Sequence, residues 1–228
     1  MRKQKQARKV HNENLTELVF ILDRSGSMQG LESDTIGGFN SMLEKQKMQK
    51  GDALVSIVLF DNYSDVIADR ASIRNVRPLT SSDYQVQGCT ALLDAIGGAI
   101  HHIGNVHKYA WPEDCPAHTL FIITTDGMEN ASRRYTYEHV RRMVTRQKNA
   151  YDWEFLFLGA NMDAIAAAAD IGIDEDRAVR YKCDGEGTQL NYQVVNEAIA
   201  SVRCDISIAP CWKSSIENDY EQRKNSDE

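Results

Sequence analysis

The stretch Leu18–Ser27, LVFILDRSGS, decides the fold that the sequence predicts. Its first part, Leu18–Leu22, is a continuous apolar run rich in branched side chains, which is typical of a strand buried on both faces of a parallel sheet. Asp23, Ser25 and Ser27 follow at alternate positions, in a turn that leads into a helical pattern. Because alternate residues of an extended segment point to the same side, one carboxylate and two hydroxyls can converge at the carboxyl end of this strand.

Three oxygen donors in one turn are suited to Mg²⁺ or Mn²⁺. A plainer interpretation of the same residues is that Ser25 or Ser27 only caps the next helix. The pattern Asp-x-Ser-x-Ser is short and recurs by chance, so the metal hypothesis depends on further oxygen donors from elsewhere in the chain.

The composition fits one α/β domain with a sizeable core. The chain has 228 residues, of which 42% are hydrophobic, and its 26 Lys and Arg against 33 Asp and Glu give a net charge of −7. This charge argues against nucleic acid as a partner and favours cations. Five cysteines without a Cys-x-x-Cys pair, no secretory signal and no run of transmembrane length predict a cytoplasmic protein with reduced thiols and no membrane partner.

Composition also divides the chain into three expected segments. Residues 1–13 begin with basic side chains and no apolar run, which indicates a basic flexible arm. Residues 14–210 are expected to form the domain. Residues 211–228 carry few apolar side chains, which indicates a flexible polar tail.

Strands and helices alternate along the body of the chain. Apolar runs predict strands at residues 18–22, 53–60, 65–68, 119–125, 153–158 and 177–181, and periodic apolar positions predict helices at 33–50, 91–103, 135–149, 162–170 and 188–202. A tight turn at Asp61-Asn62 makes the strand at 65–68 an antiparallel edge strand. The pattern therefore predicts a doubly wound, mostly parallel six-stranded sheet with helices on both faces, a Rossmann-like α/β fold.

A second predicted strand also ends in an aspartate. The strand at 119–125 is followed by Asp126, and ligands of such sheets bind beyond the carboxyl ends of the strands, where the winding reverses. If this strand is the neighbour of Leu18–Leu22, Asp126 faces Asp23, and Thr90, at the start of a predicted helix, can lie over the same crevice. The oxygen-bearing side chains then form one cluster, which consists of Asp23, Ser25, Ser27, Thr90 and Asp126.

With this cluster, the sequence resembles the von Willebrand factor type A family. The metal-ion-dependent adhesion site (MIDAS) of that family combines an Asp-x-Ser-x-Ser turn with a distant Thr and a distant Asp. The matching segments are Asp23–Ser27, Gly88–Asp94 and Ile122–Gly127. One departure is Cys89, where family members often have a second glycine. The absence of a secretory signal and of paired cysteines makes the chain look like the intracellular, bacterial-type stand-alone members.

The resemblance implies a divalent-metal-dependent protein-binding module and not an enzyme. It implies that the hydroxyls of Ser25, Ser27 and Thr90 bind Mg²⁺, or Mn²⁺, directly. Asp23 and Asp126 would act largely through water, which leaves the ion electrophilic. An Asp or Glu of an unidentified partner protein would then complete the coordination, and no small-molecule substrate is expected.

Three further residues lie on the predicted rim of the site. Glu129 and Asn130 directly follow Asp126-Gly127, and Asn161 ends the next strand at the same edge. They are candidates for contacts with the partner. The plainer interpretation is a solvated loop for Glu129 and Asn130 and a helix cap for Asn161.

Three other functions fit parts of the pattern. Two carboxylates and a metal can activate water, so a Mg²⁺-dependent phosphoryl-transfer or hydrolytic enzyme is the main alternative. Phosphatases with an aspartyl nucleophile, however, need a second Asp where this chain has Ser25. Dinucleotide binding needs a glycine-rich turn, and the segment after the first strand lacks G-x-G-x-x-G. A structural module with an empty site is the third alternative.

Overall fold

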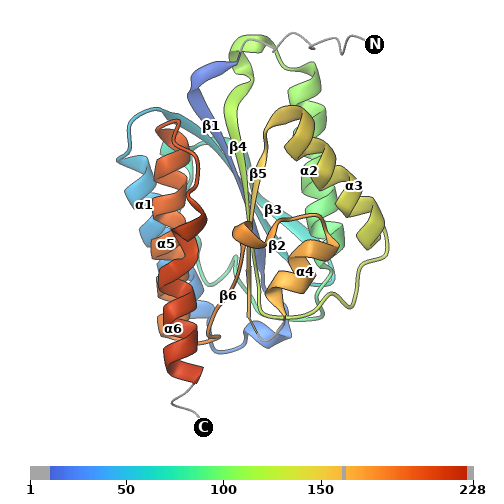
Figure 1. Cartoon of the computed structure of the whole chain (residues 1–228), viewed down its shortest axis with the longest axis vertical. Helices are drawn as coiled ribbons and strands as arrows, with labels where there is room; N and C mark the ends of the chain where they lie inside the picture. Colours follow the sequence, from blue (N-terminus) through green and yellow to red (C-terminus); the bar gives the residue numbers. More distant parts are fainter. Residues whose placement is uncertain (1–10, 161–162, 225–228) are drawn as a thin grey trace.

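The structure, a computed structural model, describes residues 11–160 and 163–224. In this part of the chain a six-stranded sheet is covered by helices on both faces (Figure 1). Its strands are β1 (Asn12–Asp23), β2 (Asp52–Phe60), β3 (Ser64–Ser72), β4 (Pro116–Thr125), β5 (Glu154–Gly159) and β6 (Ala178–Arg180). The α-helices are α1 (Glu32–Lys47), α2 (Leu92–Tyr109), α3 (Tyr137–Tyr151), α4 (Ala164–Asp170), α5 (Gly185–Arg203) and α6 (Ser214–Lys224).

The strand order is β3-β2-β1-β4-β5-β6. β1 pairs in parallel with both β2 and β4, and β3 runs antiparallel at one edge of the sheet. The chain winds outward from β1 to β3 and then crosses to β4, so the winding reverses between β1 and β4. These pairings confirm the predicted doubly wound sheet and its antiparallel edge strand.

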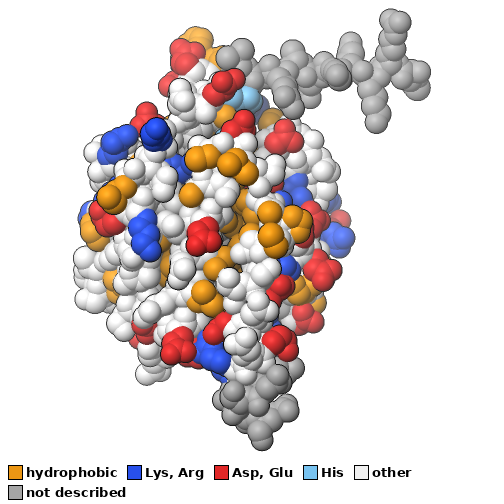
Figure 2. Space-filling model, turned by 60° about the vertical axis from the view of Figure 1, so that its left-hand side comes forward, with side chains coloured by type: hydrophobic (Ala, Val, Ile, Leu, Met, Phe, Trp, Pro, Cys, Tyr) orange, Lys and Arg blue, Asp and Glu red, His pale blue; other side chains and the backbone are white. Residues whose placement is uncertain are grey.

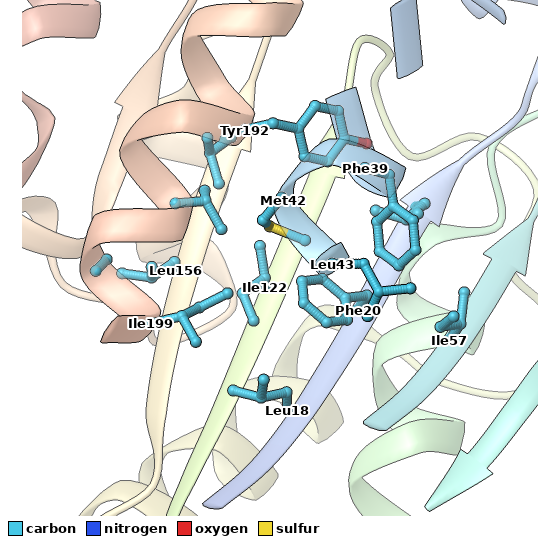
Figure 3. Close-up of a cluster of buried hydrophobic side chains, with 14 of the residues drawn as sticks. Leu18, Phe20, Phe39, Met42, Leu43, Ile57, Ile122, Leu156, Tyr192 and Ile199 are labelled. Carbon is cyan, nitrogen blue, oxygen red and sulfur yellow. The ribbon is translucent and has the colours of Figure 1, made fainter. Parts of the chain in front are cut away.

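Side chains of β1 alternate between two hydrophobic layers. Leu18, Phe20 and Leu22 pack in the layer under α1, α5 and α6, whereas Val19 and Ile21 pack in the layer under α2, α3 and α4. Figure 3 shows the first layer, with Phe20 close to Phe39 and Leu43 of α1. Because helices bury both faces of the central strand, its sequence is an unbroken apolar run.

β1, β3 and α2 extend further than the sequence predicts, and their additional residues meet in one buried polar cluster. Glu17 on β1 is fully buried, and its carboxylate accepts hydrogen bonds of 3.1 and 3.0 Å from the Nε of Arg70, at the end of β3. The Nε2 of His107, near the end of α2, lies 2.9 Å from the same carboxylate. Because polar residues carry no apolar periodicity, the sequence pattern missed these ends.

The prediction of a flexible polar tail at residues 211–228 is wrong for residues 211–224. A short 3-10 turn and α6 follow residue 209, and the Ile216 side chain is only 1% exposed. Lys213 Nζ donates 2.8 Å hydrogen bonds to the backbone carbonyls of Glu175 and Ala178. The segment is held largely by such polar contacts with distant residues, which its low apolar content does not reveal.

Parts of the predicted terminal segments lie outside the described residues. This holds for residues 1–10 of the basic arm and for residues 225–228, while residues 12 and 13 belong to β1. Figure 2 views the side of α1, α5 and α6, and basic and acidic side chains are interspersed over it. Among the helices described, none has the length and apolar character needed to cross a membrane.

Replacement of Ile216 by Ala should lower the free energy of unfolding by about 2–4 kcal/mol, because it leaves a cavity between α6 and the core. Urea unfolding measures this change. Asn218→Ala, at an exposed position of the same helix, is the control and should change the free energy by less than about 0.5 kcal/mol. Equal stability of Ile216→Ala and the control would contradict the packing of α6.

Candidate metal centre

The carboxyl ends of β1 and β4 lie side by side at one edge of the sheet, at the bottom of Figure 1. Leu22 pairs with Thr124, so Asp23, which ends β1, lies near Asp126, which follows β4. A short 3-10 turn carries the chain from β1 toward α1, and Thr90 precedes α2. Three loops therefore meet where the winding of the sheet reverses.

Four of the predicted side chains form a continuous run of polar contacts. Thr90 Oγ1 donates to Ser25 Oγ at 3.1 Å, and Ser25 Oγ lies 3.2 Å from Ser27 Oγ. Ser27 Oγ donates to Asp126 Oδ1 at 2.5 Å. Three hydroxyls and one carboxylate from three separate segments of the chain are thus in mutual contact.

The fifth predicted residue, Asp23, lies on the inner side of this run. Its Oδ1 accepts from the backbone N–H of Ser25 at 2.7 Å, and its Oδ2 accepts from the hydroxyl of Thr125 at 2.5 Å. Asp23 is 1% exposed, whereas Ser27 is exposed. The structure therefore brings all five predicted side chains together, in a site that opens to solvent on the side of Ser27.

The donor set and the local space both fit a small divalent cation. A Cβ atom at Gly127 would lie 3.2 Å from Ser27 Oγ and from Thr90 Oγ1, so the missing side chain leaves room between these hydroxyls. Hydroxyl and carboxylate oxygens are ligands that Mg²⁺ and Mn²⁺ prefer. The described residues contain no cluster of three or more His, Cys, Asp or Glu able to hold a metal, so this candidate site depends on Ser and Thr.

The loop before Thr90 fixes the backbone of the Asp-x-Ser-x-Ser turn. The hydroxyl of Tyr84 donates to the carbonyl oxygen of Asp23, and the N–H of Gly26 donates to the carbonyl of Gly88 at 3.1 Å. Gly88 has φ +69°, and a side chain there would collide with Asn62. This contact explains the glycine at position 88.

The departure from the family pattern at Cys89 is accommodated by the same contacts. The N–H of Cys89 donates to the side-chain carbonyl of Asn62, and the residue itself is exposed. A side chain at this position therefore meets solvent, and Thr90 keeps its place in the run of hydroxyls.

Both carboxyl groups of the site carry raised pKa values. The pKa of Asp23 is raised to about 6, mainly because the side chain is buried. Hydrogen bonds from Ser25 and Thr125 lower this pKa, and the nearby charge of Asp126 raises it further. Burial also raises the pKa of Asp126. The nearby guanidinium of Arg24 is turned away and pairs with Asp61 and Asp65. A bound cation would favour the ionised form of both carboxyl groups.

The predicted rim residues make internal hydrogen bonds. Asn130 Oδ1 accepts from the backbone N–H of Thr90 at 2.9 Å, and its own N–H donates to the carbonyl of Thr90 at 3.1 Å. Glu129 accepts from the N–H groups of Leu93 and Ser132, at 2.8 and 2.7 Å. Both residues therefore position Thr90 and the first turn of α2, and their contacts with a partner stay a prediction.

The third predicted rim residue, Asn161, lies outside the described residues.

Two contacts of the site were missing from the sequence prediction. The hydroxyl of Thr125 donates a hydrogen bond to Asp23 Oδ2, and the thiol of Cys183 lies 3.8 Å from Asp126 Oδ2. Cys183 follows β6 and is far from the motif in the chain, so no local spacing points to it.

Solved structures share this fold. Proximal thread matrix protein 1 from the mussel byssus, in a structure with a zinc-occupied MIDAS motif, matches with a TM-score of 0.55 and 15% identity over 84% of this chain and 47% of that chain. The ArnB paralog VWA2 from Sulfolobus acidocaldarius matches with a TM-score of 0.51 and 18% identity over 81% of this chain and 44% of that chain. The chain thus spans less than half the length of either protein. No protein-family model and no curated protein matches the sequence.

Without metal, the buried Asp23 should make the protein less stable as the pH rises. The pKa of Asp23 is about 6 in the folded protein and about 3.9 in an unfolded chain. Between these values the folded state binds more protons, so the free energy of unfolding falls with rising pH, by a total on the order of 3 kcal/mol.

Urea unfolding of the metal-stripped wild type and of Asp23→Asn, from about pH 4 to about pH 7, measures this effect. The variant removes one titrating group and leaves the others in place. The stability of the wild type should fall relative to that of the variant as the pH rises. Parallel pH profiles would contradict the account of the buried carboxyl group.

Proposed function

We propose, from the premise that the chain has the von Willebrand factor type A fold, that it is a divalent-metal-dependent protein-binding module. The proposed cofactor is Mg²⁺, or Mn²⁺, and the residues that would hold it are Asp23, Ser25, Ser27, Thr90 and Asp126. An Asp or Glu side chain of a partner protein would complete the coordination of the ion.

The observation that carries this proposal is the run of hydroxyls from Thr90 through Ser25 to Ser27. Neutral hydroxyls hold a cation without cancelling its charge. The carboxylate oxygens lie behind them, because Asp126 Oδ1 accepts from Ser27, and Asp23 accepts from Thr125 and from the backbone. A metal bound by this set would supply a positive charge that attracts an anionic ligand.

The exposure of the site supports an external ligand of this kind. Ser27 is exposed, while Asp23, Ser25, Thr90 and Asp126 are only 1–3% exposed. A partner therefore has access to one side of the site, and the protein surrounds the other sides. A carboxylate in such a partly desolvated position is held more strongly than in bulk water.

The environment of Asp23 favours binding over the alternative of phosphoryl transfer. Arg24 is the cation nearest in sequence, and a transferring phosphoryl group would need such a side chain for charge stabilisation. Its Nε donates to Asp61 at 3.0 Å and its other end pairs with Asp65, so both ends of the guanidinium are already paired. Ser25 also stands where an aspartyl phosphatase would have its second carboxylate.

Calorimetric titration of the metal-stripped protein with Mg²⁺ and Mn²⁺ tests the metal part of the proposal. The wild type should bind one ion, and Thr90→Val, which keeps the shape of the side chain but removes its oxygen, should weaken binding at least about tenfold. Thr119→Val, a buried threonine at the start of β4 away from the site, is the matched control and should bind like the wild type. Equal affinity of the two variants would overturn the assignment.

The partner part of the proposal has its own test. Immobilised wild-type protein should retain a partner in the presence of Mg²⁺ and release it when a chelator is added, and Asp23→Ala should retain none. Retention that persists in chelator would show that binding does not pass through the metal.

A further inference from the structure

A small enclosed cavity lies in the layer where α1 and α5 pack against the sheet. Its volume is about 10 Å³. Met28, which directly follows the Asp-x-Ser-x-Ser turn, and Thr124 of β4 are among its lining residues, so it adjoins the inner side of the candidate metal centre. A cavity of this size accommodates about one water molecule.

The α5 side of the cavity is polar, although it lies in the core. Thr188, Asn191 and Tyr192 line the cavity, and their side chains are 3–6% exposed. Within the described part of the chain, no hydrogen-bond partner contacts Thr188 Oγ1, Asn191 Oδ1, Asn191 Nδ2 or Tyr192 OH. Polar atoms buried without partners are rare in folded proteins, because each loses its bonds to water and gains none.

The spacing of these residues places them on one face of α5. Positions 188, 191 and 192 follow the i, i+3, i+4 pattern, and Val195 continues it with an apolar side chain. Figure 3 shows the ring of Tyr192 beside that of Phe39 of α1. The two rings pack edge-on, with their centroids 6.2 Å apart. This packing fixes Tyr192, so its hydroxyl does not reach solvent.

The chemistry of the lining defines the ligand. The cavity is lined by hydroxyls, one amide and apolar side chains, and no charged residue lines it in the described chain. Without a charged side chain in its lining, the cavity does not favour a metal ion or an anion as its occupant. The amide of Asn191 presents a donor and an acceptor together, so the ligand must both accept and donate hydrogen bonds. Water has this property and the right size.

We propose that this cavity is a binding site for one internal water molecule, which bridges Asn191 to the hydroxyls of Thr188 and Tyr192. Thr35 of α1 also lines the cavity, so the water lies between α5 and α1, next to the turn that carries Ser25 and Ser27. The water is an integral part of the packing of α5. The water site does not require a bound metal.

A high-resolution crystal structure of the metal-free wild-type protein tests the site directly. Electron density for a water molecule within hydrogen-bond distance of the Asn191 amide is the expected result. A cavity without density, or density of an occupant larger than water, would overturn the proposal.

The stability of the variant Asn191→Leu gives an independent test. A cavity that holds water and a cavity that is dry predict opposite changes in the ratio of folded to unfolded protein. If the amide binds a water, its loss should lower the ratio of folded to unfolded protein about 5- to 30-fold. If the cavity is dry, the amide is unsatisfied, and its replacement by an apolar side chain should leave the ratio unchanged or raise it.

Gln193→Leu makes the same kind of change at an exposed position of α5 and serves as the matched control.

Tyr192→Phe removes a single oxygen and provides a milder variant if Asn191→Leu does not fold. It should also lower the ratio, and an unchanged or raised ratio in Tyr192→Phe would overturn the proposal.

Discussion

The parallel pairing of β1 with β4 is the constraint on which the rest of the structure depends. It places the end of β1 beside the end of β4, so Asp23 and Asp126 meet at one edge although they are far apart in the chain. The same pairing makes β1 a strand with neighbours on both sides and helices on both faces, which requires an apolar sequence. The polar residues that directly follow such a strand are then concentrated where the winding reverses.

Burial of two carboxyl groups at this edge has an energetic cost that the surrounding contacts only partly offset. Hydrogen bonds from Thr125 and from the backbone of Ser25 stabilise ionised Asp23, yet burial still raises its pKa to about 6. A divalent cation held by the neighbouring hydroxyls would favour the charged forms of both carboxyl groups. A bound ion would therefore stabilise the folded protein, and it would be accessible from the exposed side at Ser27.

The sequence was sufficient to predict features that depend on local pattern. The apolar run before Asp23 predicts the central strand, and the order of motif residues predicts that Thr90 and Asp126 join the site. Features that depend on contacts between distant polar residues were not predictable in this way. Glu17 is buried in a strand where Arg70 donates to its carboxylate and His107 lies 2.9 Å from it, and Lys213 anchors the C-terminal segment through backbone carbonyls. Such contacts leave no periodic pattern in the sequence, because they join residues that are far apart in the chain.

The decisive experiment is X-ray diffraction from crystals grown with Mn²⁺, recorded to detect the anomalous signal of the metal. One strong peak in direct contact with the hydroxyl oxygens of Ser25, Ser27 and Thr90 is the expected result. A peak bound elsewhere, or no peak with these hydroxyls still bonded to one another as described here, would contradict it.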